Sequence, residues 1–265
     1  MVERLRTGVR NTLRRIGRAQ VNFFVHVGRI VLLLFQIIRI APQIFRNPRL
    51  TLEQMAEVGV RSIPLVFVVS IFAGATTAWQ AKYQLEGLVS AELIGTGVIK
   101  SLLLELSPVL TALIVAGRYG SAVSSELATM RVTEQIDALV TMSIDPVRYL
   151  ILPRVTAGIV MVPILVIISV LVGVVGGYFT AVTAGGIPSG KFLAGVQLFF
   201  YVRDVAVCLF KAFVFGAVTS FMGCYFGYIA KGGASGVGNA AINAFVSSAV
   251  MILAADFVVA FIAFT

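Results

Sequence analysis

Charged residues are scarce in this sequence of 265 residues. They make up 12% of the chain, whereas hydrophobic residues make up 58%. Soluble domains carry about 25% charged residues, so half that supply leaves too few to cover a large water-facing surface. The mean hydropathy of +0.97 agrees with this imbalance. The composition therefore predicts an integral membrane protein with several spans and little soluble domain.

Histidine and cysteine are almost absent. The single histidine is His26. The chain therefore lacks the residues that a catalytic triad, a multi-histidine metal site or a histidine general base requires. Cys208 and Cys224 fall in one predicted helix, roughly 24 Å apart at the helical rise, which is too far for a disulfide. We therefore expect no catalytic residue, no metal site and no cofactor in this chain.

Two glycine-rich stretches resemble phosphate-binding loops, but neither is expected to bind phosphate. Residues 185–192 read GGIPSGKF, but Phe192 stands where a phosphate loop needs a magnesium-binding hydroxyl. Residues 232–238 read GGASGVG and follow the fourth predicted span, where glycines suit a tight turn and close helix approach. Neither stretch is therefore expected to bind nucleotide.

The positive charge is concentrated at the N-terminus. Residues 1–50 hold ten arginines and one acid, Glu3, and so carry the whole net charge of +9. Beside a membrane domain, such an arm is expected to bind the anionic bilayer face, and no nucleic acid. Residues 19–45 are apolar but carry Arg29 and Arg39 on a polar side, which favours an amphipathic helix lying in the interface. The alternative is a first true span.

Five stronger hydrophobic segments follow, each long enough for a hydrocarbon core of about 30 Å. They cover residues 60–80, 98–117, 155–182, 205–230 and 240–264. We expect residues 1–50 to form the basic tail and interfacial helix, and residues 51–265 to form a five-span domain. A cytoplasmic N-terminus places 16 basic residues inside and leaves five outside or within spans, as the positive-inside rule prefers.

The segment between the second and third spans, residues 121–155, is polar and rich in helix formers. A helix of about six turns in this segment would place Val132, Ile136 and Leu139 on one face. The acids Glu126, Glu134 and Asp137 would lie on the opposite face. Such a helix either receives force from a partner or is an ordinary interfacial loop helix.

The most distinctive run covers residues 105–139 and reads ELSPVLTALIVAGRYGSAVSSELATMRVTEQIDAL. Together with Asp145-Pro146, Pro153-Arg154 and residues 211–216, 232–238 and 256–257, it resembles the MlaE/YrbE permeases, the membrane subunits of MCE-associated ABC transporters. The likeness extends from about residue 15 to 265. It implies an interfacial N-terminal helix followed by five spans, and a cytoplasmic coupling helix between spans two and three. Some relatives carry Arg before the acid matching Glu105, whereas this chain has Leu104.

The resemblance also implies function and partners. The expected activity is movement of phospholipid or a related lipid between the inner membrane and a periplasmic MCE-domain carrier, for outer-membrane lipid homeostasis. The expected assembly is a multi-pass inner-membrane homodimer with an ABC ATPase, the MCE-domain protein and, in many systems, a STAS-domain protein. A scaffold or channel subunit is the alternative, and a membrane enzyme is more remote.

Three groups of site residues are predicted. Coupling to the ATPase is assigned to Glu126, Met130, Thr133, Glu134 and Asp137, although docking at the 232–238 turn is an alternative. Lipid binding is assigned to one face of the first span, with Glu105 at its rim: Leu65, Val69, Phe72, Ala73 and Thr76. Lys211 and Asp256 lie at similar depths in spans four and five, and are expected to pair because isolated charges in the bilayer are costly. Glu105 is expected to remain freer, and snorkelling of Lys211 is the alternative.

Overall fold

The computed structural model describes residues 25, 28–42, 48–85, 90–198 and 200–264. The chain forms two compact units, Met1–Gln43 and Ile44–Thr265. In the first unit, residues 28–40 are helical and expose Arg29 and Arg39, so this part of the predicted 19–45 helix is confirmed as helix. Its location in the membrane interface stays a prediction. The arginine tail at residues 1–18 lies outside the described residues.

Among its described residues, the second unit contains five helical segments long and apolar enough to cross a membrane. These segments overlap all five predicted spans, so the predicted all-α membrane fold is confirmed. The first contains α2 (Pro48–Val58), η2 (Val60–Ser62) and α3 (Ile63–Leu85). The second contains α4 (Ala91–Ser101), η3 (Leu102–Leu106), α5 (Ser107–Val115), η4 (Ala116–Gly120) and α6 (Ser121–Val132). The others are η5 (Val147–Ile151) with α8 (Leu152–Thr183), then α10 (Val202–Tyr228), then α11 (Gly233–Phe264).

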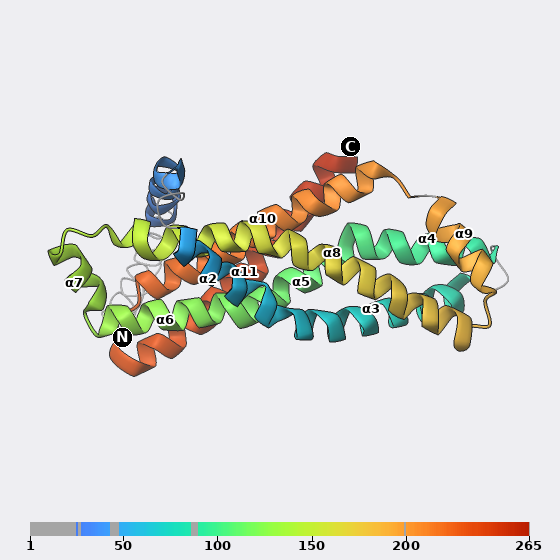
Figure 1. Ribbon diagram of the computed structural model, residues 1–265, viewed down its shortest axis with the longest axis horizontal. Coiled ribbons are helices and arrows are strands. Elements are labelled where there is room, and N and C mark those ends of the chain that lie inside the picture. Colours follow the sequence, from blue (N-terminus) through green and yellow to red (C-terminus); the bar gives the residue numbers. More distant parts are fainter. Residues whose placement is uncertain (1–24, 26–27, 43–47, 86–89, 199, 265) are drawn as a thin grey trace, which may run out of the picture. The chain divides into compact units, whose positions relative to one another are not determined.

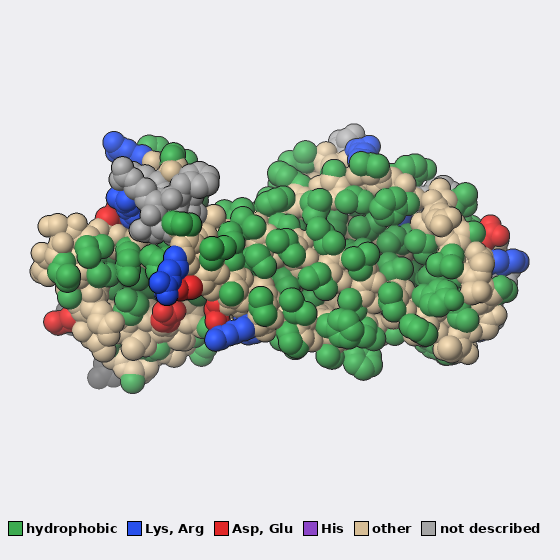
Figure 2. All heavy atoms as spheres, viewed as in Figure 1, with side chains coloured by type: hydrophobic (Ala, Val, Ile, Leu, Met, Phe, Trp, Pro, Cys, Tyr) green, Lys and Arg blue, Asp and Glu red, His purple; other side chains and the backbone are tan. Residues whose placement is uncertain are grey.

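Two short helices connect spans at opposite ends of this unit. Helix α7 (Gln135–Thr141) joins spans two and three, and α9 (Ser189–Leu198) joins spans three and four. Figure 1 shows α7 at one end, and α4 and α9 at the other. In Figure 2 the surface between these ends is largely hydrophobic, while most charged side chains lie toward the ends. This distribution is that of a protein whose middle lies in hydrocarbon.

Small residues set the packing of the long helices. Helix α8 packs against α3, α10 and α2. A Cβ added to Gly74 on α3 would overlap the backbone of Gly173 on α8, and one added to Gly216 on α10 would overlap the backbone of Gly158. Glycines permit this close approach of backbones, which drives helix association where no hydrophobic effect operates between spans.

The two glycine-rich stretches have structural roles. Phe192 is fully buried in a cluster with Ala78, Ile94 and Val98, so the GGIPSGKF segment anchors α9 against α4. At the other stretch, Gly232 and Gly233 have φ values of +97° and +68°, a backbone region that favours glycine. The predicted tight turn between α10 and α11 is therefore confirmed.

Candidate functional site

A charge cluster lies inside the helical bundle. Lys211 on α10 is completely buried, and its Nζ is 2.7 Å from Asp256 Oδ1 on α11. The same ammonium lies 2.9 Å from Glu105 Oε1 and donates a hydrogen bond of 2.8 Å to the carbonyl oxygen of Leu104, both on η3. Three oxygens thus surround a group with three N–H donors. The cluster ties spans two, four and five together.

This arrangement decides between the sequence-based expectations for Lys211. The structure contains the expected contact with Asp256, and the complete burial of Lys211 is incompatible with snorkelling. The expectation that Glu105 remains freer is wrong, because Glu105 also binds the ammonium. The physical reason is that one carboxylate would leave buried N–H donors without acceptors, which is costly. Even so, 49% of the Glu105 side chain is exposed, against 17% for Asp256.

In the described residues, two π-helical segments interrupt the second span and a third begins the third span, all near polar groups. Glu105 lies in η3, Arg118 and Tyr119 lie in η4, and η5 begins the third span. A π-segment adds a residue to a turn and re-aims the side chains around it, and such segments are frequent at functional sites. The sequence offers no simple signal for them, because the three segments, LLLEL, AGRYG and VRYLI, share no residue pattern.

The predicted lipid-binding face lies on the outward side of α3. Leu65, Phe72 and Thr76 are exposed, and Val69 and Ala73 are half-buried. The opposite side of α3 packs against α8, where Ser70 Oγ donates a 2.8 Å hydrogen bond to Ser169 Oγ. Glu105 belongs to the span that packs beside α3 through α4 and α5. The face is therefore available to a lipid or a second subunit, and its lipid-binding role stays a prediction.

The predicted coupling segment is two helices, and the expectation of one continuous helix is wrong. Helix α6 continues the second span and ends at Val132, and α7 begins at Gln135. Between them, Glu134 has a φ of 59°, which breaks the helical path. The Nη1 of Arg131 lies 2.5 Å from Asp137 Oδ1 across this break, an interaction that the helical wheel could not place.

The break also separates the two predicted faces of this segment. Of the three apolar residues, Ile136 is buried, Leu139 is half-buried and Val132 is exposed. On the acidic side, Thr133, Glu134 and Asp137 are exposed and Met130 is half-buried. Their role in binding an ATPase stays a prediction. Glu126 lies apart on α6, where it has a partner of its own.

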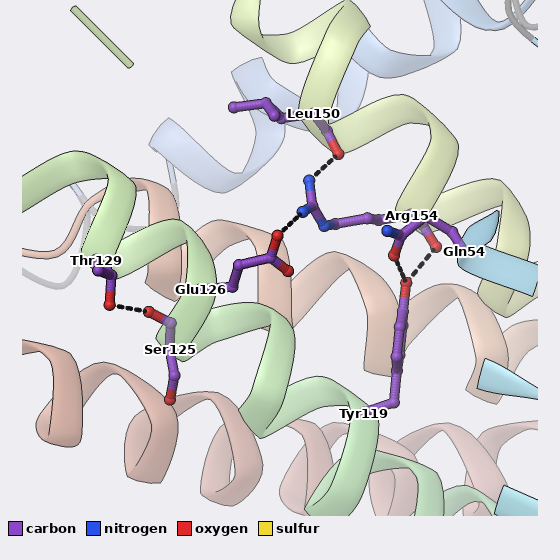
Figure 3. A network of polar contacts seen from close by, with 7 residues as sticks. All are labelled: Gln54, Tyr119, Ser125, Glu126, Thr129, Leu150 and Arg154. Atoms are coloured by element: carbon purple, nitrogen blue, oxygen red, sulfur yellow. Dashed lines mark hydrogen bonds and ion pairs between the residues drawn. The ribbon is translucent and has the colours of Figure 1, made fainter. Parts of the chain in front are cut away.

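Glu126 belongs to a polar network at the α7 end (Figure 3). Its Oε1 accepts a 2.7 Å hydrogen bond from Nη2 of Arg154, the third residue of α8. Nη1 of Arg154 donates to the carbonyl oxygen of Leu150 at 2.8 Å. The side chain of Arg154 is 6% exposed, whereas that of Glu126 is 56% exposed. The cation is therefore held in the protein and the carboxylate reaches the surface.

Tyr119 extends this network to α2. Its hydroxyl has two acceptors within reach, Gln54 Oε1 at 3.1 Å and the backbone oxygen of Arg154 at 3.3 Å. Tyr119 and Gln54 line a cavity of ≈ 670 Å³, together with Glu57, Ala122, Val123 and Glu126. The sequence alone indicates no site role for Gln54, Tyr119 or Arg154. The three are widely separated along the chain, so periodicity could not connect them.

Arg118 makes a second connection between η4 and the first span. Its Nε donates a 3.0 Å hydrogen bond to Ser62 Oγ, and its guanidinium also donates to the backbone oxygen of Glu57. The Glu57 carboxylate lies 3.6 Å from Nη1 of Arg118. Neighbouring residues 118 and 119 thus both bind the segment that contains α2 and η2.

These features define a class of protein. Five apolar helices, closely packed through glycines and holding a buried ion-pair cluster, make the chain a multi-pass α-helical membrane protein. A family model for the MlaE permeases matches residues 51–262. The chain belongs to this family and is an ABC transporter permease, a transport component rather than a catalytic one.

Individual relatives agree with the family match. A probable ABC transporter permease of Rickettsia conorii is 38% identical over 251 residues, which cover 94% of this chain and 96% of that protein. A probable ABC transporter permease of Synechocystis is 40% identical over 82% of this chain and 83% of that protein. A probable ABC transporter permease of Pyropia yezoensis is 34% identical over 82% of this chain and 83% of that protein.

Proposed function

We propose that this permease moves phospholipid, or a related lipid, between the inner membrane and a periplasmic MCE-domain carrier, and so serves outer-membrane lipid homeostasis. Two copies form a homodimer, and a separate ABC ATPase binds ATP and Mg²⁺ and drives the cycle. A STAS-domain protein is a further candidate partner. The chain lies in the inner membrane with its N-terminus in the cytoplasm.

The observation that carries this proposal is the outward face of α3. Leu65, Val69 and Phe72 present apolar surface at helical spacing, and Thr76 continues the stripe. Such a stripe suits acyl chains, which require apolar contact and form few hydrogen bonds. A second copy placed opposite would close the stripe into a groove. Helix α11 is also largely exposed and apolar, and it offers surface for a neighbouring subunit or for bilayer lipid.

Photocrosslinking tests the lipid assignment. A photoreactive residue at Val69 or Thr76 is expected to capture phospholipid in the assembled transporter, measured by mass spectrometry of the crosslinked peptide. The matched control is Leu171, which is exposed on α8 in the third span. The proposed site predicts much stronger capture on α3 than at Leu171. Capture at Leu171 with none at the α3 positions would show that the lipid site lies elsewhere.

A native mass spectrum of the detergent-extracted complex tests the assembly. The expected spectrum contains two permease copies, two ATPase copies, an MCE-domain protein and bound phospholipid. A permease recovered without an ATPase under conditions that preserve the dimer would instead favour a scaffold or channel.

A further inference from the structure

Helices α6 and α8 are joined by side chains across an edge where they do not pack closely. Helix α6 packs mainly against α10 and α11, whereas α8 packs mainly against α3, α10 and α2. The ion pair between Glu126 and Arg154, at 2.7 Å, bridges these two groups of helices. The cavity of ≈ 670 Å³ lies beside the bridge, so this edge has free space around it.

The opposite edge of α6 and α8 is held tightly by α10. A Cβ on Gly227 of α10 would come within 2.7 Å of the Leu127 side chain and the Ser124 backbone on α6. Further along α10, Gly216 meets the backbone of Gly158 on α8. Helices in direct backbone contact cannot easily shift against each other, because no flexible side chain lies between them. Relative motion of α6 and α8 is therefore easiest at the edge that holds Glu126 and Arg154.

We infer that Arg154 is a positioning residue that transmits movement of α6 to α8, while Tyr119, on the same span as α6, connects that span to α2. Its guanidinium binds Glu126 on α6 while Nη1 holds the Leu150 carbonyl in η5. Its backbone oxygen accepts from Tyr119, whose hydroxyl also reaches Gln54 on α2. Arg154 thus joins span three to span two at two points, Glu126 and Tyr119, and Tyr119 in turn reaches span one. The inference rests on the proposed function, since it requires a partner that moves the α6–α7 segment.

This inference gives Glu126 a role different from that of an ATPase contact. Its carboxylate bridges α6 to α8, whereas Glu134 lies at the helix break and Asp137 pairs locally with Arg131 across it. Removing the Glu126–Arg154 bridge should therefore leave ATPase binding in place and reduce the lipid moved per ATP hydrolysed. If Glu126 instead docked the ATPase, removing the bridge would reduce ATPase binding before it reduced the lipid moved per ATP hydrolysed.

The test uses Arg154→Met in the complete transporter, reconstituted with its ATPase. This change leaves Glu126 on the surface, where water solvates it, and keeps the backbone oxygen that binds Tyr119. Arg49→Met is the matched control, because Arg49 forms an exposed ion pair with Glu53 on α2. Glu126→Gln is a second variant that keeps an oxygen acceptor for Arg154. The measurements are co-purified ATPase, ATP hydrolysis and fluorescent phospholipid transferred.

For Arg154→Met we expect ATPase recovery and hydrolysis within about twofold of the unmodified protein, and lipid transferred per ATP at least fivefold lower. Glu126→Gln should show a smaller loss in the same direction, and Arg49→Met none. The inference is overturned if folded Arg154→Met matches Arg49→Met, or if it loses its ATPase. If Arg154→Met does not fold, an unchanged transfer ratio in Glu126→Gln overturns it.

A spin-label measurement separates this inference from the proposed function. Labels at Thr129 on α6 and Val160 on α8, in chains diluted with unlabelled permease, report the distance between the two helices. The distance distribution should broaden in Arg154→Met and remain narrow in Arg49→Met. If the unmodified complex moves no lipid, the proposed function fails, and this distance still reports whether Arg154 links the helices. An unchanged distribution in Arg154→Met contradicts the inference whatever the substrate.

Discussion

At the scale of single residues, Lys211 shows how a membrane interior accommodates a charge. An ammonium in hydrocarbon requires acceptors for all its N–H donors, and no water is available to provide them. Glu105 and the Leu104 carbonyl accept hydrogen bonds from the ammonium, and Asp256 on α11 lies beside it as a second counter-ion. Removing the cation leaves two carboxylates close to the same position, so their mutual repulsion adds to the loss of pairing.

Lys211→Met should therefore lower the stability of the permease in detergent, by about 3 kcal/mol on the scale of broken buried pairs. Adding Asp256→Leu should restore much of the loss, because the more exposed Glu105 is left as the single acid of the cluster. Thermal unfolding of the purified protein provides the measurement. Lys191→Met is the matched control, since Lys191 is exposed on α9. Equal stability of the single and double variants would argue against the pairing.

At the scale of elements, the α6–α7 break exposes a small acidic surface at the end of the bundle. Glu134 and Asp137 lie there with Thr133. Interfacial charges set specificity and register more than affinity, so a partner that docks here needs complementary basic groups. Glu126 lies before the break and is held by Arg154, which makes the two sets of acids separable by mutation.

Reversing Glu134 and Asp137 to Lys together should leave membrane insertion and dimerisation unchanged and reduce ATPase co-purification at least tenfold. Repulsion from the basic groups of the partner is the expected cause. Glu53→Lys, a reversal of an exposed acid on α2, is the control. Normal ATPase recovery by the double reversal would mean that docking occurs elsewhere, for example at the turn around Gly232.

Some elements of this fold can be predicted from the sequence, and others cannot. All five spans follow from apolar length, and the turn at Gly232 follows from glycine chemistry. The break at Glu134 does not, because the segment has helix-forming residues and no proline or glycine. The contacts of Glu126, Tyr119 and Lys211 join residues 28 to 107 positions apart. Such contacts depend on how helices pack, and periodicity within a helix cannot reveal them.

At the scale of the whole molecule, the positive-inside rule sets an orientation that labelling can test. Cysteine placed at Arg39 should react with a membrane-impermeant maleimide only after the cytoplasm is opened. Cysteine at Lys191 should react in spheroplasts with intact inner membranes. Cys208 and Cys224 are buried, so the unmodified chain provides a low background. Reaction of position 39 from the periplasm would contradict the proposed topology.

The cluster around Lys211 also has a consequence for biosynthesis. Translation proceeds from the N-terminus, so Glu105 is already made when Lys211, 106 residues later, leaves the ribosome. Asp256 is made later, with the last span. A nascent chain holding four spans thus already contains one carboxylate for its lysine, and the fifth span brings the second. Glu105 thus provides a counter-ion for the cation before the bundle is complete, and Asp256 on the final helix then fixes its position.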